Sequence, residues 1–428
     1  MVIWLYRFLF LPLLLVLAPY YLLRMRRRGG YRRDFYNRFG FMGLVPAKSQ
    51  GVKRIWIQAV SVGETLAIAP ILRKLTTDPT VEIYLTTTTS TGYALARANY
   101  ENDTIGVGYF PLDFWFFSAR AWREIKPDLV ILTEGERWPE HIHQAAKRGM
   151  PVLCINARMS DRSYARMRLI RGLVPSLMGG VSKLLAVSAE DAERLQDLGF
   201  AADRIEITGN IKLDVVITEL SAQERHTWRT ELGLGADDLI LLGSSTWPGE
   251  EAALVGAWQK IRESGISCRL LLVPRHMERR EELVELLENS DASFHVRSTG
   301  IAQREVDVAL ADTTGELQRL TQLADVVFVG KSLGDHTEGQ TPVEAAALGR
   351  AIVFGPGMAN FRAIAADLVG AEAALQVSDP VELSKVCREL LEVPERRLAL
   401  GEAAHRWHRA NQGAVDRTVR AIRLLLGA

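Results

Sequence analysis

The sequence is poor in cysteine and carries almost no net charge. Its 428 residues include three cysteines, Cys154, Cys268 and Cys387, which are widely spaced and form no CxxC pair. This usage argues against a disulfide framework or a structural zinc site and favours a reducing compartment. Lysine and arginine together number 52, aspartate and glutamate 51, so the net charge of +1 gives no indication of a nucleic-acid partner.

Several ligand-binding signatures are also absent. No well-placed GxGxxG is present, which argues against a nicotinamide enzyme, and no GxxxxGKS/T indicates a P-loop NTPase. No DxD motif or His/Asp cluster indicates a metal site, so we expect a reaction without metal or other cofactor. The length predicts two domains rather than one.

The N-terminal segment is apolar and predicts a membrane anchor. Its first 23 residues carry one charged side chain, Arg7, and just reach the roughly 20 apolar residues that a membrane span needs. The arginines that follow predict a cytoplasmic side for the body, where they face anionic head groups: Arg24, Arg26, Arg27, Arg28, Arg32 and Arg33. The alternatives are a helix lying in the membrane interface, because Pro12 and Pro19 interrupt a straight span, and a buried helix of the globular body.

Strand, loop and helix alternate through the rest of the chain, which is the pattern of doubly wound α/β domains. Buried strands are predicted at 55–60, 81–86, 129–132, 152–155, 184–187 and 205–208, and again at 239–243, 270–273, 306–310, 326–329 and 351–354. The polar helical segment 213–238 separates the two sets. Two Rossmann-like domains that face a cleft constitute the GT-B fold. We therefore predict an anchor at 1–30, an N-terminal domain at 31–215, a C-terminal domain at 216–400, and a C-terminal helix at 401–428 that packs back on the N-terminal domain.

Acidic side chains follow two predicted strands of the first half, where open α/β sheets bind ligands. Glu64 lies in the first turn of a helix after the strand at 55–60. A carboxylate there either complements the helix dipole or acts as a base, and the pattern leaves both interpretations open. Glu134 and Glu136 follow the strand at 129–132 and form a second candidate acid/base or electrostatic feature.

The second half offers groups that suit a phosphorylated ligand. Arg275 can donate two hydrogen bonds to a phosphate, although a surface ion pair is the alternative. A helix predicted from Thr341, with Pro342 at its first position, has free backbone N–H groups, or is simply a well-capped helix. Gly315 and Glu316 begin another helix, where backbone and carboxylate can bind a base or ribose.

Ten short motifs, in order along nearly the whole chain, resemble the bacterial Kdo transferases. These enzymes transfer 3-deoxy-D-manno-octulosonic acid (Kdo) from CMP-Kdo to the lipid A precursor, lipid IVA, in lipopolysaccharide biosynthesis. One motif alone would be weak evidence, whereas ten in sequence are specific. The motifs are WIQAVSVGET (Trp56–Thr65), EGERWPE (Glu134–Glu140), NARMSDRS (Asn156–Ser163), GNIKLD (Gly209–Asp214), LVPRH (Leu272–His276), DTTGEL (Asp312–Leu317), FVGKSL (Phe328–Leu333), TPVEAAALG (Thr341–Gly349), FGPGMANF (Phe354–Phe361) and NQGA (Asn411–Ala414).

The resemblance implies an inverting, metal-independent glycosyltransferase on the cytoplasmic face of the bacterial inner membrane, whose lipids are further partners. It implies that Glu64 is the general base that takes the proton of the acceptor's primary hydroxyl. It implies that Glu134 and Lys212 stabilise the transition state. The segments that match CMP contacts are Pro274-Arg275, Thr314-Gly315-Glu316 and Thr341-Pro342-Val343-Glu344.

Three positions depart from the family pattern. Thr341 replaces the usual Asn, and Lys331 replaces the second glycine of GGS, which adds a cation near the expected donor site. Trp247 lies where His is often found. Two other classes compete with a Kdo transferase. A nucleotide-sugar epimerase of similar shape would need no anchor, and a degenerate membrane scaffold would be expected to lack Glu64 or Arg275, which are both present. No motif encodes the number of Kdo residues transferred.

Overall fold

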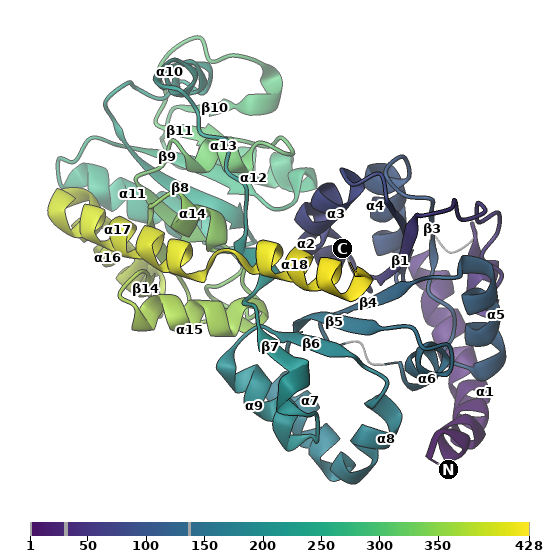
Figure 1. The fold of residues 1–428 in the computed structure, drawn as a ribbon. Helices are drawn as coiled ribbons and strands as arrows, with labels where there is room; N and C mark the ends of the chain where they lie inside the picture. Colours follow the sequence, from purple (N-terminus) through teal and green to yellow (C-terminus); the bar gives the residue numbers. More distant parts are fainter. Residues whose placement is uncertain (1, 30–32, 136–137, 428) are drawn as a thin grey trace. The chain divides into compact units, whose positions relative to one another are not determined.

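The computed structural model describes residues 2–29, 33–135 and 138–427, and these form two compact units (Figure 1). Unit 1 comprises Met1–Asp214 together with Gln412–Ala428, and unit 2 comprises Val215–Asn411. Three residues of the sequence predictions lie outside the described residues: Arg32 of the basic cluster, and Glu136 and Arg137 of the EGERWPE motif.

Unit 1 is built on a seven-stranded parallel sheet with the order β3-β2-β1-β4-β5-β6-β7. Six of its strands correspond to strands that the sequence predicts, whereas β3, which is short and contains two glycines, is not predicted. The strand order reverses between β1 and β4, which is the topological switch point where such sheets bind ligands. The strands are β1 (Lys53–Gln58), β2 (Val81–Thr87), β3 (Gly106–Tyr109), β4 (Leu129–Thr133), β5 (Val152–Ala157), β6 (Lys183–Ala186) and β7 (Ile205–Ile207).

Helices cover both faces of this sheet, so successive side chains of one strand enter different cores. Ile55 and Ile57 of β1 pack in one hydrophobic cluster with α3 and α18. Trp56, between them, packs in the opposite cluster against Trp122 of α5. This two-sided burial explains why the strands read as apolar runs. The helices described in unit 1 are α1 (Val2–Arg28), α2 (Val62–Ala67), α3 (Ala69–Thr76), α4 (Ser90–Tyr100), α5 (Trp115–Ile125), α6 (Pro139–Lys147), α7 (Asp161–Leu169), α8 (Val174–Met178), α9 (Ala189–Asp197) and α18 (Ala414–Leu426).

The C-terminal helical region consists of two helices rather than the single helix that the sequence predicts over 401–428. α17 (Pro394–Asn411) belongs to unit 2, and α18 belongs to unit 1. The break lies at Gly413, whose φ of +90° is accessible to glycine and would strain a side chain. Asp214 fixes the start of α18, because its carboxylate accepts the N–H groups of Gly413 and Val415 at 2.8 and 2.6 Å.

Unit 2 has its own seven-stranded parallel sheet, with the order β10-β11-β9-β8-β12-β13-β14. The order reverses between β8 and β12, which makes that boundary the switch point of this unit. The strands are β8 (Leu239–Thr246), β9 (Cys268–Pro274), β10 (Phe294–Val296), β11 (Val308–Leu310), β12 (Val326–Val329), β13 (Ala351–Phe354) and β14 (Leu375–Gln376). The short strands β10 and β14 are not predicted by the sequence. Other helices described here are α10 (Ala222–Glu231), α11 (Glu250–Glu263), α12 (Arg280–Glu288), α13 (Leu317–Thr321), α14 (Val343–Ala347), α15 (Arg362–Gly370) and α16 (Pro380–Glu392).

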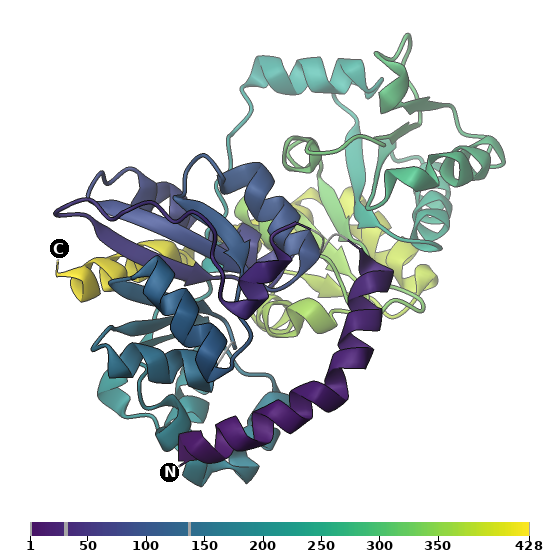
Figure 2. The same cartoon turned by 90° about the vertical axis from the view of Figure 1, so that its right-hand side faces the viewer.

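The N-terminal helix α1 is long, bent and partly docked on its own unit (Figure 2). Among the described residues, no single helix is long and apolar enough to cross a membrane. The segments Val2–Phe10 and Pro12–Tyr21, bent by 41°, meet the length and composition only as a pair. Arg7 donates two hydrogen bonds, 2.8 and 2.9 Å long, to the fully buried carboxylate of Glu140 in α6. The first segment is therefore held by polar contacts, and the ring of Phe10 also stacks on that of Phe114.

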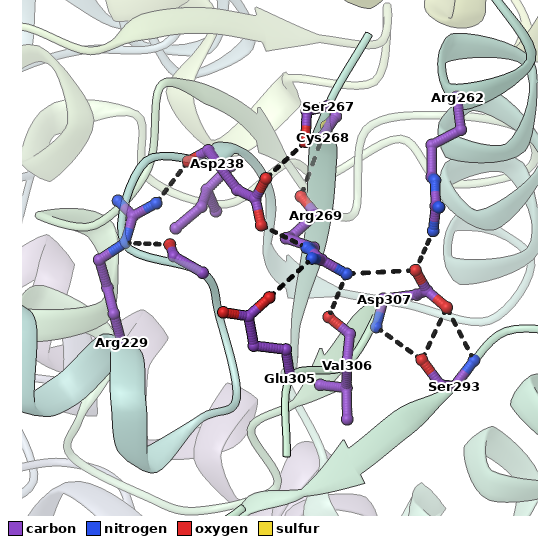
Figure 3. A network of polar contacts seen from close by, with 12 residues as sticks. Arg229, Asp238, Arg262, Ser267, Cys268, Arg269, Ser293, Glu305, Val306 and Asp307 are labelled. Atoms are coloured by element: carbon purple, nitrogen blue, oxygen red, sulfur yellow. Dashed lines mark hydrogen bonds and ion pairs between the residues drawn. The ribbon is translucent and has the colours of Figure 1, made fainter. Parts of the chain in front are cut away.

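In each unit, an arginine connects the amino ends of neighbouring strands. In unit 2, Arg269 at the start of β9 contacts Asp238, which precedes β8, and Asp307, which precedes β11 (Figure 3). In unit 1, Arg54 of β1 is 1% exposed and donates to Glu82 of β2 and to the carbonyl of Ile125. These networks lie at the edge opposite to the carboxyl ends of the strands, so they stabilise the sheets and leave the ligand edge free.

Candidate active site

Glu64 lies at the carboxyl end of β1, in the first turn of α2. Ser61 caps this helix, because its Oγ accepts the N–H of Glu64 at 3.5 Å. The Glu64 carboxylate accepts the N–H of Val60 at 2.9 Å and also the hydroxyl of Thr133 in β4. Burial to 8% exposure raises the pKa of Glu64 above its usual value, against these hydrogen bonds, which favour the ionised form. The result is a carboxylate without an ion-pair partner among the described residues.

Glu134 follows Thr133 directly, at the end of the neighbouring strand β4, and it is held between two cations. Lys212 donates to Glu134 Oε1, and Arg158 Nη2 lies 3.1 Å from Oε2. Burial opposes ionisation of Glu134, but Lys212 and Arg158 outweigh it and hold the pKa of the carboxyl below its usual value. Glu134 is therefore a negative charge held in place, and its lowered pKa contrasts with the raised pKa of Glu64.

Two asparagines bring Lys212 to this place from the edge of the sheet. Lys212 lies in a short 3₁₀ helix, Ile211–Leu213, that follows β7. Asn210 accepts the N–H of Lys212 at 3.0 Å, and Asn156 of β5 accepts the N–H of Ile211 at 3.1 Å. Asn156 and Glu134 have φ values of +51° and +52°, conformations that non-glycine residues adopt at a cost and that cluster at functional sites. The structure thus brings together Glu64, Glu134 and Lys212.

The predicted nucleotide-binding segments all lie in unit 2. Two of them follow the neighbouring strands β9 and β11, and the third leads into α14. Pro274 is the last residue of β9, and the N–H of Arg275 donates to the carbonyl of Thr246 in β8 at 3.1 Å. The Arg275 side chain is exposed, and within the described part of the chain its guanidinium makes no hydrogen bond or ion pair. It is available to an anionic ligand.

The segment Thr314-Gly315-Glu316, after β11, has an exposed backbone at Gly315 and a Glu316 carboxylate that already contacts other residues of the chain. Thr314 and Gly315 are exposed, and a Cβ added to Gly315, which has a φ of +82°, would meet open space. Glu316 accepts the hydroxyl of Thr313 and lies 3.6 Å from Arg297. A ligand can therefore approach the backbone at Gly315 closely, whereas Glu316 already has protein partners.

The helix predicted to start with Thr341 as its cap begins one residue later than expected. α14 covers Val343–Ala347, and the N-cap position is Pro342 rather than Thr341. The Thr341 hydroxyl nevertheless accepts the N–H of Val343, two residues further on, at 3.3 Å, which is the side-chain contact expected of an N-cap residue. Burial raises the pKa of Glu344 in the first turn of this helix above its usual value.

Known proteins are similar to this chain over nearly its whole length. The chain is 32% identical over 419 residues to the Haemophilus influenzae protein named 3-deoxy-D-manno-octulosonic acid transferase. The aligned region covers 96% of this chain and 97% of that protein. The chain belongs to the Kdo transferase family. A family model described as 3-Deoxy-D-manno-octulosonic-acid transferase (kdotransferase) matches residues 33–215. The resemblance inferred from the motifs is confirmed, and membership places the chain among the glycosyltransferases of lipopolysaccharide biosynthesis.

Solved structures of low sequence identity share the fold. Anabaena HepE in complex with UDP is 14% identical, with a TM-score of 0.58 over 88% of this chain and 100% of that one. A UDP-GlcNAc 2-epimerase from Neisseria meningitidis is 13% identical, with a TM-score of 0.57 over 86% of this chain and 99% of that one. Together with the two parallel sheets, these likenesses confirm the GT-B α/β prediction. A transferase family and an epimerase share this fold, so the fold does not select the activity.

Three contacts of this Kdo transferase site are not evident from the sequence. Thr133 connects Glu64 to the Glu134 segment, and Arg158 provides the second cation at Glu134. Glu250 binds the backbone of the loop that follows β12. Thr133, Arg158 and Glu250 each follow or end a strand, and polar residues at such positions indicate a ligand site. Their contact partners lie in distant segments of the sequence, so the contacts themselves could not be predicted. Within the described residues, no group of three or more His, Cys, Asp or Glu side chains is placed to hold a metal ion.

Proposed function

We propose that this chain is an inverting glycosyltransferase that moves Kdo from CMP-Kdo to the lipid A precursor, lipid IVA, with Glu64 as the general base. One observation carries the proposal. At the switch point of unit 1, the buried Glu64 carboxylate accepts the Thr133 hydroxyl and has no cationic partner among the described residues, whereas Glu134, the next residue after Thr133, is paired with Lys212 and Arg158. Two acids with opposite pKa tendencies suit separate roles in one reaction.

In the proposed reaction, the primary hydroxyl of the acceptor attacks the anomeric carbon of Kdo. The Glu64 carboxylate accepts the hydroxyl proton as the new glycosidic bond forms. The bond from the anomeric carbon to the CMP phosphate oxygen breaks, and its electron pair leaves with CMP. One base and one displacement, without a covalent intermediate, invert the anomeric centre. The raised pKa of Glu64 makes it a stronger base than an exposed glutamate, provided that the pH keeps it ionised.

Glu134 and Lys212 act on charge rather than on protons in this proposal. The anomeric carbon becomes cationic as CMP departs, and an ionised Glu134 is favourable near it. Lys212 offsets negative charge on the phosphate or on the carboxylate of Kdo. Preorganised groups of this kind contribute roughly 2.7–4 kcal/mol each to the transition state. Their mutual ion pair keeps both in place before the substrate arrives.

CMP is assigned to unit 2 in this proposal. The Arg275 guanidinium, which has no partner in the described part of the chain, suits a phosphate because it can donate two parallel hydrogen bonds. The open backbone at Thr314-Gly315-Glu316 and the turn at Thr341-Pro342-Val343-Glu344 are the other contacts. CMP carries one phosphate, so we expect transfer to continue in the presence of a chelator.

The membrane is the proposed location of the acceptor and of the enzyme. Large apolar side chains of α1 are exposed, including Trp4, Phe8, Leu13 and Val16. A lipid surface is the partner that would cover them. We propose association with the bacterial inner membrane, with the body on the cytoplasmic face. Treating membranes with high salt or with alkaline carbonate would separate electrostatic attachment from apolar insertion.

The decisive experiment supplies CMP-Kdo and lipid IVA, and it measures CMP release and the mass of the lipid product. Glu64→Gln should reduce transfer by roughly 10²–10⁴-fold. A matched control is Glu190→Gln, since Glu190 also lies in the first turn of a helix after a strand of unit 1, and it should transfer normally. Transfer by Glu64→Gln at the parent rate would contradict the base assignment. An isomerised sugar nucleotide without lipid growth would indicate an epimerase. The lipid mass also counts the Kdo residues added.

A further inference from the structure

Lys331 and Trp247 meet at the switch point of unit 2. Trp247 follows β8 and Lys331 follows β12, the two strands between which the order of this sheet reverses. The Lys331 ammonium lies 4.0 Å from the centre of the Trp247 ring. A cation over the face of an indole is attracted by the ring, and Trp is the most favourable aromatic residue for this contact.

The Lys331 backbone adopts a conformation that glycine would adopt without strain. Its φ is +59°, in the left-handed region. A non-glycine residue held in that region points to a functional requirement for its side chain, because the fold itself would favour glycine. The Lys331 side chain is only 18% exposed, which is unusual for lysine.

Glu250 fixes the positions of both residues. Its carboxylate is 2% exposed and accepts the N–H groups of Lys331 and Ser332 at 2.8 Å and of Leu333 at 3.1 Å. The same carboxylate accepts the N–H of Trp247 at 2.8 Å. One buried side chain thus holds the two loops in register, so the ammonium and the indole face each other before any ligand binds.

The Lys331 ammonium lies beside aromatic side chains and has few acidic neighbours among the described residues. His276 and His336 contact the Trp247 ring, with centroids 4.9 and 5.8 Å away. Glu338, 3.3 Å from the ammonium and half exposed, is the one acidic partner that the described residues provide. An ammonium has three N–H donors, so capacity remains for an anionic ligand.

The Lys331 loop is also connected to the segments assigned to CMP. The N–H of Gly339 donates to the Lys331 carbonyl at 2.7 Å, and the N–H of Gln340 donates to the Gly330 carbonyl at 3.0 Å. These bonds bring the chain back to the loop immediately before Thr341. On the other side, His276 at the Trp247 ring is the residue after Arg275. Lys331 therefore lies between two proposed donor-binding segments.

We infer that the Lys331 ammonium, seated on Trp247, binds an anionic group of the sugar-nucleotide donor, either the CMP phosphate or the carboxylate of Kdo. This inference deepens the proposed function and rests on it. The two anions share one chemistry, a charge-assisted hydrogen bond from the ammonium. Trp247 is a positioning residue here, because it acts on the donor through Lys331.

The test is Lys331→Gly, which removes the ammonium and relieves the backbone. Glu372→Gly is the matched control, since Glu372 is an exposed residue of unit 2 with a φ of +52°. Both variants should keep or raise the melting temperature. Lys331→Gly should weaken binding by about tenfold, the loss expected for one charge-assisted hydrogen bond, whereas Glu372→Gly should bind as the parent does. CMP affinity is measured by calorimetry, and KM for CMP-Kdo by CMP release with lipid IVA.

The two measurements identify the anion. Weaker binding of CMP itself assigns Lys331 to the phosphate, whereas a raised KM for CMP-Kdo with unchanged CMP affinity assigns it to the Kdo carboxylate. Trp247→Leu should raise whichever of the two constants Lys331→Gly raises, the dissociation constant of CMP or the KM for CMP-Kdo, but by a smaller factor. A change of less than about threefold in both constants for Lys331→Gly overturns the inference. If the parent itself neither binds CMP nor transfers Kdo, the proposed function fails instead.

Discussion

Lys212 and Glu134 form an ion pair that connects the edge of one sheet to its centre. Lys212 follows β7, the last strand of unit 1, and Glu134 follows β4, next to the switch point. Arg158, after β5, contacts the second oxygen of the same carboxylate. The three residues come from three different strand ends, and the two cations hold the pKa of the Glu134 carboxyl below its usual value.

Replacing Lys212 by methionine should lower kcat far more than it lowers stability. The variant loses the cation proposed for the transition state, so kcat should fall by roughly 10²–10³-fold. The Lys212 side chain is 26% exposed and Glu134 keeps Arg158, so the free energy of unfolding should fall by about 1 kcal/mol or less. Rates of CMP release and denaturant unfolding measure the two effects. Arg158→Met, which removes the more exposed cation, should reduce kcat less, and a Lys212→Met enzyme with the parent kcat would contradict the role of Lys212.

The pH dependence of transfer should have an acidic limb set by Glu64. A general base must be ionised, and burial raises the pKa of Glu64, so kcat/KM should fall as the pH falls through a value above the usual 4.3 or so. Glu134 does not contribute a limb there, because its pKa is lowered and it stays ionised. The measurement is kcat/KM across pH with lipid IVA in excess. Residual activity of Glu64→Gln should lack this limb, and a limb of unchanged position in that variant would assign it to another group.

Arg269→Met should destabilise unit 2 without altering the chemistry of each folded molecule. The substitution leaves Asp238 and Asp307 without their shared arginine, both with side chains below 20% exposure, at a cost of about 1–3 kcal/mol. Burial opposes ionisation of Asp238, but Ser267 and Arg269 outweigh it and lower its pKa. Its contribution is therefore present at neutral pH and lost as the pH falls through the lowered pKa. Urea unfolding at neutral and acidic pH should show a smaller difference between parent and variant in acid, and equal differences would contradict this account.

Arg7→Met should destabilise unit 1, because it leaves the fully buried Glu140 carboxylate without its cation. Removal of one partner from a buried ion pair costs about 3–5 kcal/mol. Adding Glu140→Gln should restore much of the loss, since an amide needs no counter-charge. Thermal unfolding of the single and double variants measures this, and a double variant no more stable than Arg7→Met would show that the arginine acts through packing.

Much of the fold is predictable because a buried strand is a run of apolar residues in the sequence. Runs such as 129–132 are apolar because both faces of the sheet are covered, and most strands of both units are found in this way. β3 is missed because two of its four residues are glycine, and β14 because it has only two residues. β10 is missed although β7 and β11, which are equally short, are predicted. The long C-terminal helix was predicted as continuous because helical periodicity runs through both α17 and α18, and one glycine decides the break.

The sequence by itself determined the alternation of strands and helices, the acidic and basic residues at the strand ends, and the family, because these depend on neighbours along the chain. Only the tertiary structure decided which strand ends meet: Glu64 with Thr133, Glu134 with Lys212, and Lys331 with Trp247. Strand order and register are set by packing across the whole sheet, and no spacing between two residues in the sequence encodes them.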